Sequence, residues 1–279
     1  MADSTVPSIE LNNGTTIPQL GFGVFQIAPA DTKAAVLDAL EVGYRHIDTA
    51  QMYGNEREVG EAIRESGIPR DDIFVTTKLN NNAHEPQAAR DATSRSVDAI
   101  GVGPIDLYLI HWPMPGVGDF VETWKVLEQI YAEGQSRAIG VSNFQAAHLD
   151  RLIAETDVVP AVNQIEVHPY LAQNDLRAVD AEHGIVTEAW SPIAQGDVLD
   201  DPALLAIAAE TGRTAAQVTL RWHIQRGDVV FPKSTTHSRV VENFELFDFT
   251  LSDDQMSRID GLDAGRRRGP NPDDFNWIP

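Results

Sequence analysis

Hydrophobic positions along the chain alternate between short continuous runs and longer stretches with helical spacing. The short runs are rich in β-branched residues and predict eight strands, at residues 21–25, 45–48, 73–78, 106–110, 138–141, 161–165, 185–189 and 229–231. The amphipathic stretches between them predict helices at residues 31–41, 56–66, 86–100, 120–132, 146–155 and 175–182. The unit repeats about every thirty residues, which leaves room for a helical crossover between parallel strands.

Three segments depart from this regular repeat. Residues 8–17, with Asn13-Gly14 between apolar positions, predict a β-hairpin ahead of the first strand. Residues 204–210 and 215–225 predict two helices before the last strand, and the polar chain from residue 263 onward predicts a loop. Because no linker or break in composition divides the chain, we expect a single domain over residues 1–279.

Polar and ionisable residues gather where successive predicted strands end. They are Asp48, Lys78, His111, Ser142, Asn143, Gln164, Glu166, Trp190, Ser191, Lys233 and Ser234. Eight strand–helix units fit either a closed barrel or a large open sheet. In a barrel the carboxyl ends of all strands converge on one face, whereas an open sheet gathers its chemistry at one switch point. The distribution favours an α/β fold of the (β/α)8 TIM-barrel type, with an N-terminal β-hairpin and extra C-terminal helices and loop.

Three of these positions, together with Tyr53, suit the reduction of a carbonyl group. A nearby lysine such as Lys78 lowers the pKa of a tyrosine such as Tyr53, and a carboxylate such as Asp48 keeps the lysine charged. The tyrosine then serves as a general acid toward a carbonyl oxygen that accepts a hydride. A neutral histidine, here His111, can donate a hydrogen bond to the same oxygen. Each residue alone has a structural explanation, but the four together favour catalysis.

The segments around these residues resemble the aldo-keto reductase family over nearly the whole chain. The similar segments are GYRHIDTA at 43–50, YGNE at 53–56, DLYLIHWP at 106–113, IGVSNF at 139–144, NQIEVHP at 163–169 and FPKS at 231–234. Within the family the chain looks most similar to prokaryotic 2,5-diketo-D-gluconate reductases. The resemblance implies that Tyr53 is the acid, that Lys78 and Asp48 tune it, and that His111 orients the carbonyl.

The resemblance also implies a nicotinamide cofactor. Ser142, Asn143 and Gln164 would hydrogen-bond the nicotinamide carboxamide. Trp190 would stack on the nicotinamide ring, and Ser191 belongs to the same cofactor-binding set.

The phosphate end of the cofactor can be argued from the residues themselves. Lys233 and Arg239 offer positive charge, and Ser234 and Thr235 offer hydroxyl groups, next to a helix expected to begin near residues 236–238. A helix N-terminus with an arginine suits a phosphate, so we expect NADPH rather than NADH. The adenine contacts are expected from Glu242 and Asn243.

Phe22, Trp112 and Trp277 are the candidate walls of the substrate pocket. Many similar proteins have a tryptophan after the segment equivalent to Lys78-Leu79, but this chain has three asparagines at residues 80–82. The resemblance therefore does not carry a substrate preference with it.

The composition of the chain limits the binding partners and the cellular compartment that we expect. The chain has 42 acidic against 21 basic residues, a net charge of −21, which disfavours nucleic acid and anionic membranes as partners. It has no cysteine, and its N-terminus shows no signal-peptide pattern, so we expect a cytoplasmic protein, and a monomer by resemblance.

Three other functions fit the sequence less well. A Rossmann dehydrogenase is disfavoured because Gly21-Phe22-Gly23 lacks the third glycine of its fingerprint. A hydrolase is disfavoured because no GxSxG segment occurs, and no metal-binding spacing is present. A nucleotide-binding barrel with a sensing role and little turnover stays as the alternative.

Overall fold

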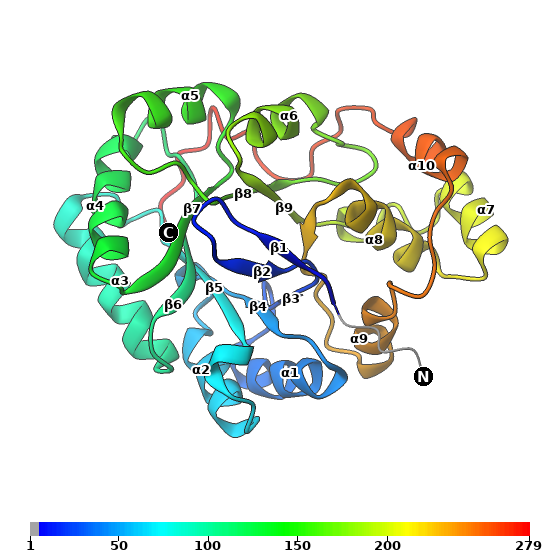
Figure 1. The fold of residues 1–279 in the computed structure, drawn as a ribbon, viewed down its shortest axis with the longest axis horizontal. Helices are drawn as coiled ribbons and strands as arrows, with labels where there is room; N and C mark the ends of the chain where they lie inside the picture. Colours follow the sequence, from blue (N-terminus) through cyan, green and yellow to red (C-terminus); the bar gives the residue numbers. More distant parts are fainter. Residues whose placement is uncertain (1–5) are drawn as a thin grey trace.

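The computed structural model describes residues 6–279 and contains a barrel of parallel strands (Figure 1). The strands are β3 (Phe22–Gly23), β4 (His46–Asp48), β5 (Phe74–Leu79), β6 (Ile105–Ile110), β7 (Ser136–Ser142), β8 (Val162–Glu166), β9 (Val186–Trp190) and β10 (Val229–Val230), and they pair in chain order. The two edges meet where Leu20 pairs in parallel with Val230, and the Gly21 amide donates to the Val230 carbonyl at 2.7 Å. The predicted (β/α)8 barrel is confirmed.

Helices cover the outside of the barrel. They are α1 (Pro29–Val42), α2 (Glu56–Glu65), α3 (Pro86–Ile100), α4 (Phe120–Ala132), α5 (Ala146–Glu155), α6 (Asn174–Glu182), α7 (Pro202–Thr211), α8 (Ala215–Arg226), α9 (His237–Phe244) and α10 (Asp253–Asp260). Short 3-10 turns, η1 (Gln51–Tyr53), η2 (Arg70–Asp72) and η3 (Ala194–Gly196), lie in the connections. The helices predicted from periodicity are confirmed to within a few residues at each end.

The N-terminal hairpin, β1 (Ser8–Glu10) and β2 (Thr16–Pro18), closes one end of the barrel (Figure 1). Leu11 and Ile17 are 2% and 0% exposed and pack on inward-facing side chains such as Leu107 and Leu109. This apolar plug seals the amino ends of the strands, so ligands have access only from the carboxyl ends.

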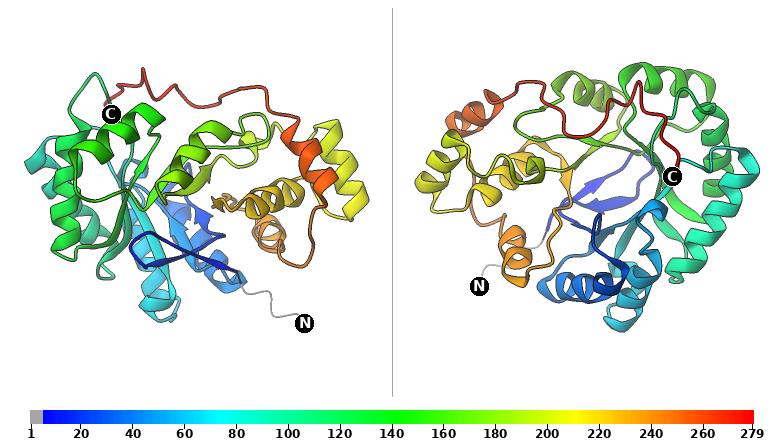
Figure 2. Two further views of the ribbon diagram at one scale, coloured as in Figure 1. Left: turned by 45° about the horizontal axis from the view of Figure 1, so that its top comes forward. Right: turned by 180° about the vertical axis from the view of Figure 1, so that it is seen from behind.

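The C-terminal tail crosses the opposite end of the barrel. After α10, which periodicity did not predict, the chain has no further helix or strand and runs over the carboxyl ends of the strands (Figure 2). The loop predicted from residue 263 onward is therefore confirmed, and it lies over the face where the polar residues were expected to converge.

Candidate active site

A buried ion pair stands at the centre of the carboxyl-end face. Lys78 on β5 is 0% exposed, and its Nζ donates to Asp48 Oδ1 at 2.8 Å, to Asp48 Oδ2 at 2.9 Å and to the Thr49 carbonyl at 2.9 Å. Burial lowers the pKa of Lys78, but the charge and hydrogen bonds of Asp48, together with the other acidic groups nearby, outweigh burial and hold the pKa above its usual value. The lysine is therefore a fixed cation with all three protons engaged.

Tyr53 lies against this cation at the end of η1. Lys78 Nζ is 5.1 Å from the centroid of the Tyr53 ring. Burial raises the pKa of Tyr53, and the charge of Lys78 offsets this only in part. Lys78 lowers the pKa of Tyr53 as expected, but desolvation and the Asp48 charge raise it by more, so the pKa lies above its usual value. Tyr53 therefore holds its proton at neutral pH.

His111, directly after β6, completes the predicted set of four. Its ring packs edge-on against the Tyr53 ring, with centroids 5.8 Å apart. Burial and the charge of Lys78 lower the pKa of His111 well below its usual value, so the imidazole is neutral. The structure thus brings Asp48, Tyr53, Lys78 and His111 together from neighbouring strands, as the barrel hypothesis requires.

The residues expected at the nicotinamide form a connected group beside these four. Asn143 has a left-handed backbone (φ 64°), held by hydrogen bonds from its Nδ2 to the His111 carbonyl at 2.9 Å and from Trp190 Nε1 to its Oδ1 at 2.8 Å. Ser142 Oγ donates to the Gln164 carbonyl at 2.8 Å. A fixed indole next to converging amide and hydroxyl groups fits a planar ring bearing a carboxamide.

Gln164 links two buried carboxyl groups. Its Nε2 donates to Asp48 Oδ2 at 2.9 Å and to Glu188 Oε2 at 2.7 Å. Glu188 on β9 is 0% exposed and was not predicted to belong to the site. The signal for it was an acidic residue inside an apolar strand, two positions before Trp190 and therefore on the same side of the strand.

Glu166 at the end of β8 anchors the tail. It is 0% exposed and accepts hydrogen bonds from His168 Nε2 at 3.0 Å and from the backbone amide of Gly269 at 2.9 Å. Gly269 lies so close to the indole of Trp190 that a Cβ at this position would be 2.4 Å from Cη2. Arg268 contacts Asp197 in the loop after β9. The tail therefore packs on the residue expected to hold the nicotinamide.

The expected phosphate region lies between β10 and α9. Lys233 and Arg239 are exposed, and neither forms an ion pair within residues 6–279. Ser234 is buried and accepts from the Thr236 amide at 3.0 Å, just before α9 begins at His237. Among the other predicted residues, Thr235 is exposed, Asn243 is buried, and Glu242 accepts a hydrogen bond from Thr214 at 2.8 Å. The predicted helix start is confirmed, and two cations flank it.

The predicted substrate walls are only partly supported. Phe22 is 1% exposed and packs against Tyr44 with ring centroids 5.7 Å apart, so the prediction that it faces substrate is wrong. Phe25, by contrast, is 51% exposed, and its ring centroid is 5.0 Å from that of Tyr53. Trp112 packs on Phe275 of the tail at 4.3 Å, and Trp277 is exposed.

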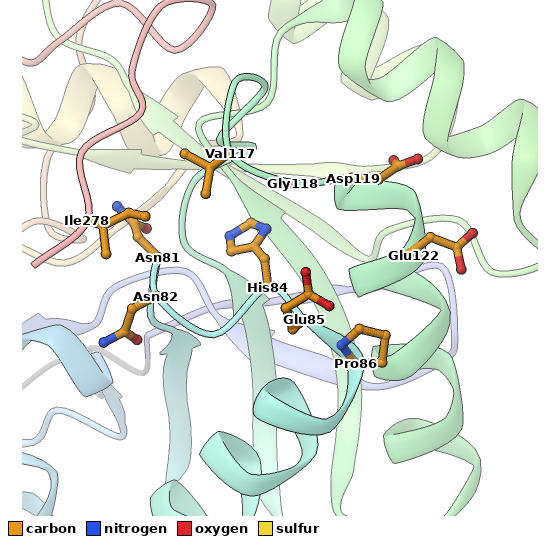
Figure 3. A pocket seen from close by; sticks show the side chains of 10 residues that line it. All are labelled: Asn81, Asn82, His84, Glu85, Pro86, Val117, Gly118, Asp119, Glu122 and Ile278. Atoms are coloured by element: carbon orange, nitrogen blue, oxygen red, sulfur yellow. The ribbon is translucent and has the colours of Figure 1, made fainter.

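A cavity of about 340 Å³ lies at the rim of this face, between the loops after β5 and β6 and the end of the tail (Figure 3). Asn81 and Asn82 of the asparagine segment line it, together with His84 and Ile278. Asn81 Nδ2 also donates to the Trp277 carbonyl at 3.0 Å. The asparagine segment therefore lines part of this recess and holds the tail.

Comparison with known proteins places this site in a family. Residues 18–264 match the model of the Aldo/keto reductase family. An aldo-keto reductase of Mycolicibacterium smegmatis is 52% identical over 97% of this chain and 98% of its own, and the methylglyoxal reductase DkgA of Escherichia coli is 47% identical over 99% of each. The crystal structure of a Gox0644 variant in complex with NADPH superposes with a TM-score of 0.94 at 41% identity, over 98% of this chain and all of the other. The chain belongs to the aldo/keto reductase family and is an oxidoreductase.

Within residues 6–279, no helix combines the length and the apolar character needed to cross a membrane. The same residues include no cluster of three or more side chains placed to hold a metal ion.

Proposed function

We propose that this protein reduces aldehydes and ketones to alcohols with NADPH, and that Tyr53 protonates the carbonyl oxygen. The observation that carries the proposal is the packing of a protonated Tyr53 and a neutral His111 around the fixed Lys78 cation. NADPH supplies the hydride when it is bound. The carbonyl oxygen gains negative charge during this transfer and needs a proton at the same time.

The protonation states of Tyr53, Lys78 and His111 give each residue a different role in this step. Tyr53 keeps its proton until the oxygen requires it, because burial raises its pKa. As the proton leaves, the Lys78 charge stabilises the phenolate, and Asp48 keeps that lysine in place. His111 donates a hydrogen bond and adds no second charge, because its imidazole is neutral.

We infer that the cofactor runs from Trp190 to α9. Ser142, Asn143 and Gln164 would hold the carboxamide, and Ser191 would follow them along the cofactor. Lys233 and Arg239 would bind the 2′-phosphate, with help from the hydroxyl groups of Ser234 and Thr235. Glu242 and Asn243 would lie at the adenine. The NADPH complex of the Gox0644 variant supports this choice of cofactor.

Replacing Tyr53 by phenylalanine tests the chemistry and leaves the binding surface nearly unchanged. Cofactor binding, measured by quenching of tryptophan fluorescence, should survive. Turnover of a carbonyl should fall by orders of magnitude, since a general acid contributes about 10²–10⁴-fold. Turnover equal to that of the unmodified protein would show that another group donates the proton.

A nucleotide-binding barrel with a sensing role is not favoured. A protein that only binds the nucleotide has no use for a tyrosine held between a buried cation and a neutral histidine. The matched relatives also include a protein named as a methylglyoxal reductase.

A further inference from the structure

We propose that Glu188 is a positioning residue that fixes which end of the Gln164 carboxamide faces the nicotinamide. The proposal rests on the function proposed above, because the group to be oriented is the expected partner of the nicotinamide. It begins from the two hydrogen bonds that Gln164 makes inside the barrel.

Both amide protons of Gln164 are committed to carboxyl oxygens, one on Asp48 at 2.9 Å and one on Glu188 at 2.7 Å. Turning the carboxamide over would place its carbonyl oxygen against these two oxygens, which is electrostatically unfavourable. The orientation is therefore set by chemistry: the NH2 group faces inward, and Oε1 remains as the acceptor offered to a ligand. Such an oxygen would accept from the NH2 group of a nicotinamide carboxamide.

Asp48 alone would fix this orientation less firmly, because it also accepts two hydrogen bonds from Lys78. Glu188 has no such competing partner. It lies directly opposite Gln164 in the register of β8 and β9, and its other oxygen, Oε1, is buried without a hydrogen-bond partner in the described structure. Among residues 6–279, the only hydrogen bond of this carboxyl group is therefore the one from Gln164.

The protonation of Glu188 is consistent with this role. The titratable groups that face it are Asp48 from β4 and Lys78 from β5, while β10 places Val229 opposite it in register. A single lysine cannot balance two buried carboxylates. Burial, and next the charge of Asp48, raise the pKa of Glu188 to about 8. At neutral pH the carboxyl group is therefore protonated. With the proton on Oε1, which has no hydrogen-bond partner among residues 6–279, Oε2 still accepts from Gln164, and no second negative charge lies beside the Lys78–Asp48 pair.

The proton can be tested without any turnover. Infrared difference spectra of the free protein against E188Q, recorded between about pH 6 and about pH 10, should show a protonated carboxyl band that is lost near pH 8. Subtracting E188Q removes the signal of Asp180, whose pKa burial raises to about 6. A carboxyl group that is already ionised at pH 6 would overturn the neutral form of the proposal.

The orientation is tested by the affinity for NADP+. E188L removes the acceptor and should weaken binding about tenfold, the equivalent of one hydrogen bond, and E188Q should restore most of that loss. In the double variant E188L/Q164L the glutamate change should add nothing to the effect of Q164L, because Glu188 acts through Gln164. Additive losses, or unchanged affinity in a folded E188L protein, would refute the inference.

These affinities separate the inference from the proposed function. A protein that binds NADP+ but reduces no carbonyl would contradict the function and still report on Glu188. If the protein reduces carbonyls but E188L binds NADP+ as tightly as the unmodified protein does, only the inference about Glu188 is contradicted.

Discussion

Replacing Lys78 by methionine should destabilise the protein through the carboxylate that it leaves behind. Methionine has a similar length and an apolar end, so little cavity is created. The change removes two hydrogen bonds to Asp48 and, among residues 6–279, the only cation in contact with it; Gln164 is then the remaining side-chain donor to this buried group in that part of the chain. Breaking one side of a buried pair costs about 3–5 kcal/mol.

The cost should depend on pH in a defined direction. Burial raises the pKa of Asp48 even with Lys78 in place, and removing the lysine, whose charge lowers that pKa, raises the folded-state value further above the unfolded value of about 3.9. The loss of stability is then complete above the folded-state pKa, and it shrinks as the pH falls toward about 4 because the carboxyl group takes up a proton. Urea unfolding at about pH 8 and about pH 4 measures the stability near both limits.

A second variant separates charge from packing. Combining Lys78→Met with Asp48→Asn removes both charges and keeps an acceptor for Gln164, so most of the stability should return at pH 8. If the double variant is as unstable as the single one, or if the single deficit is equal at both pH values, the charge argument is wrong.

Three further predictions concern the pH response, the cofactor and the tail. His111 stays neutral in the folded protein, whereas its imidazole binds a proton in the unfolded chain below about pH 6.5, so the free energy of unfolding falls on acidification. Urea unfolding at a series of pH values should show a smaller fall for His111→Asn. Arg239→Gln should weaken binding of NADP+ about tenfold and of NAD+ little, whereas the equally exposed Arg57→Gln on α2 should change neither; equal losses for both nucleotides would remove the arginine from the phosphate site. Gly269→Ala forces the tail off the indole of Trp190 and should raise KM for the carbonyl. Gly261→Ala is the control, because its Cβ would meet nothing nearer than 3.4 Å, and it should leave KM unchanged. The same KM in both variants would show that the tail does not shape the pocket.

The sequence predicted the barrel because its signals are local and repeated. Each strand is a short apolar run, each helix has its own period, and the residues of the catalytic set sit at strand ends that the topology must bring together. The helix α10 was missed because it is short and mostly exposed, with Ile259 as its only buried side chain, so its hydrophobic period is weak.

Side-chain direction and burial were harder to predict. Phe22 and Phe25 are both aromatic residues near the first strand, and only the structure shows that Phe22 packs on Tyr44 while Phe25 faces Tyr53. The rise in the Tyr53 pKa depends on how much water reaches the hydroxyl, which no motif records. Glu188 was missed because its partner, Gln164, lies on another strand.

The most direct test of the account is the oxidation of NADPH by the purified protein in the presence of a panel of carbonyls, followed by the loss of reduced-nicotinamide absorbance, with NADH in parallel. The panel should include methylglyoxal, an aromatic aldehyde and a diketo sugar acid. We predict turnover with NADPH and little with NADH, together with the loss of that turnover in Tyr53→Phe. Tight binding of NADPH without oxidation in the presence of any carbonyl would contradict the proposed function.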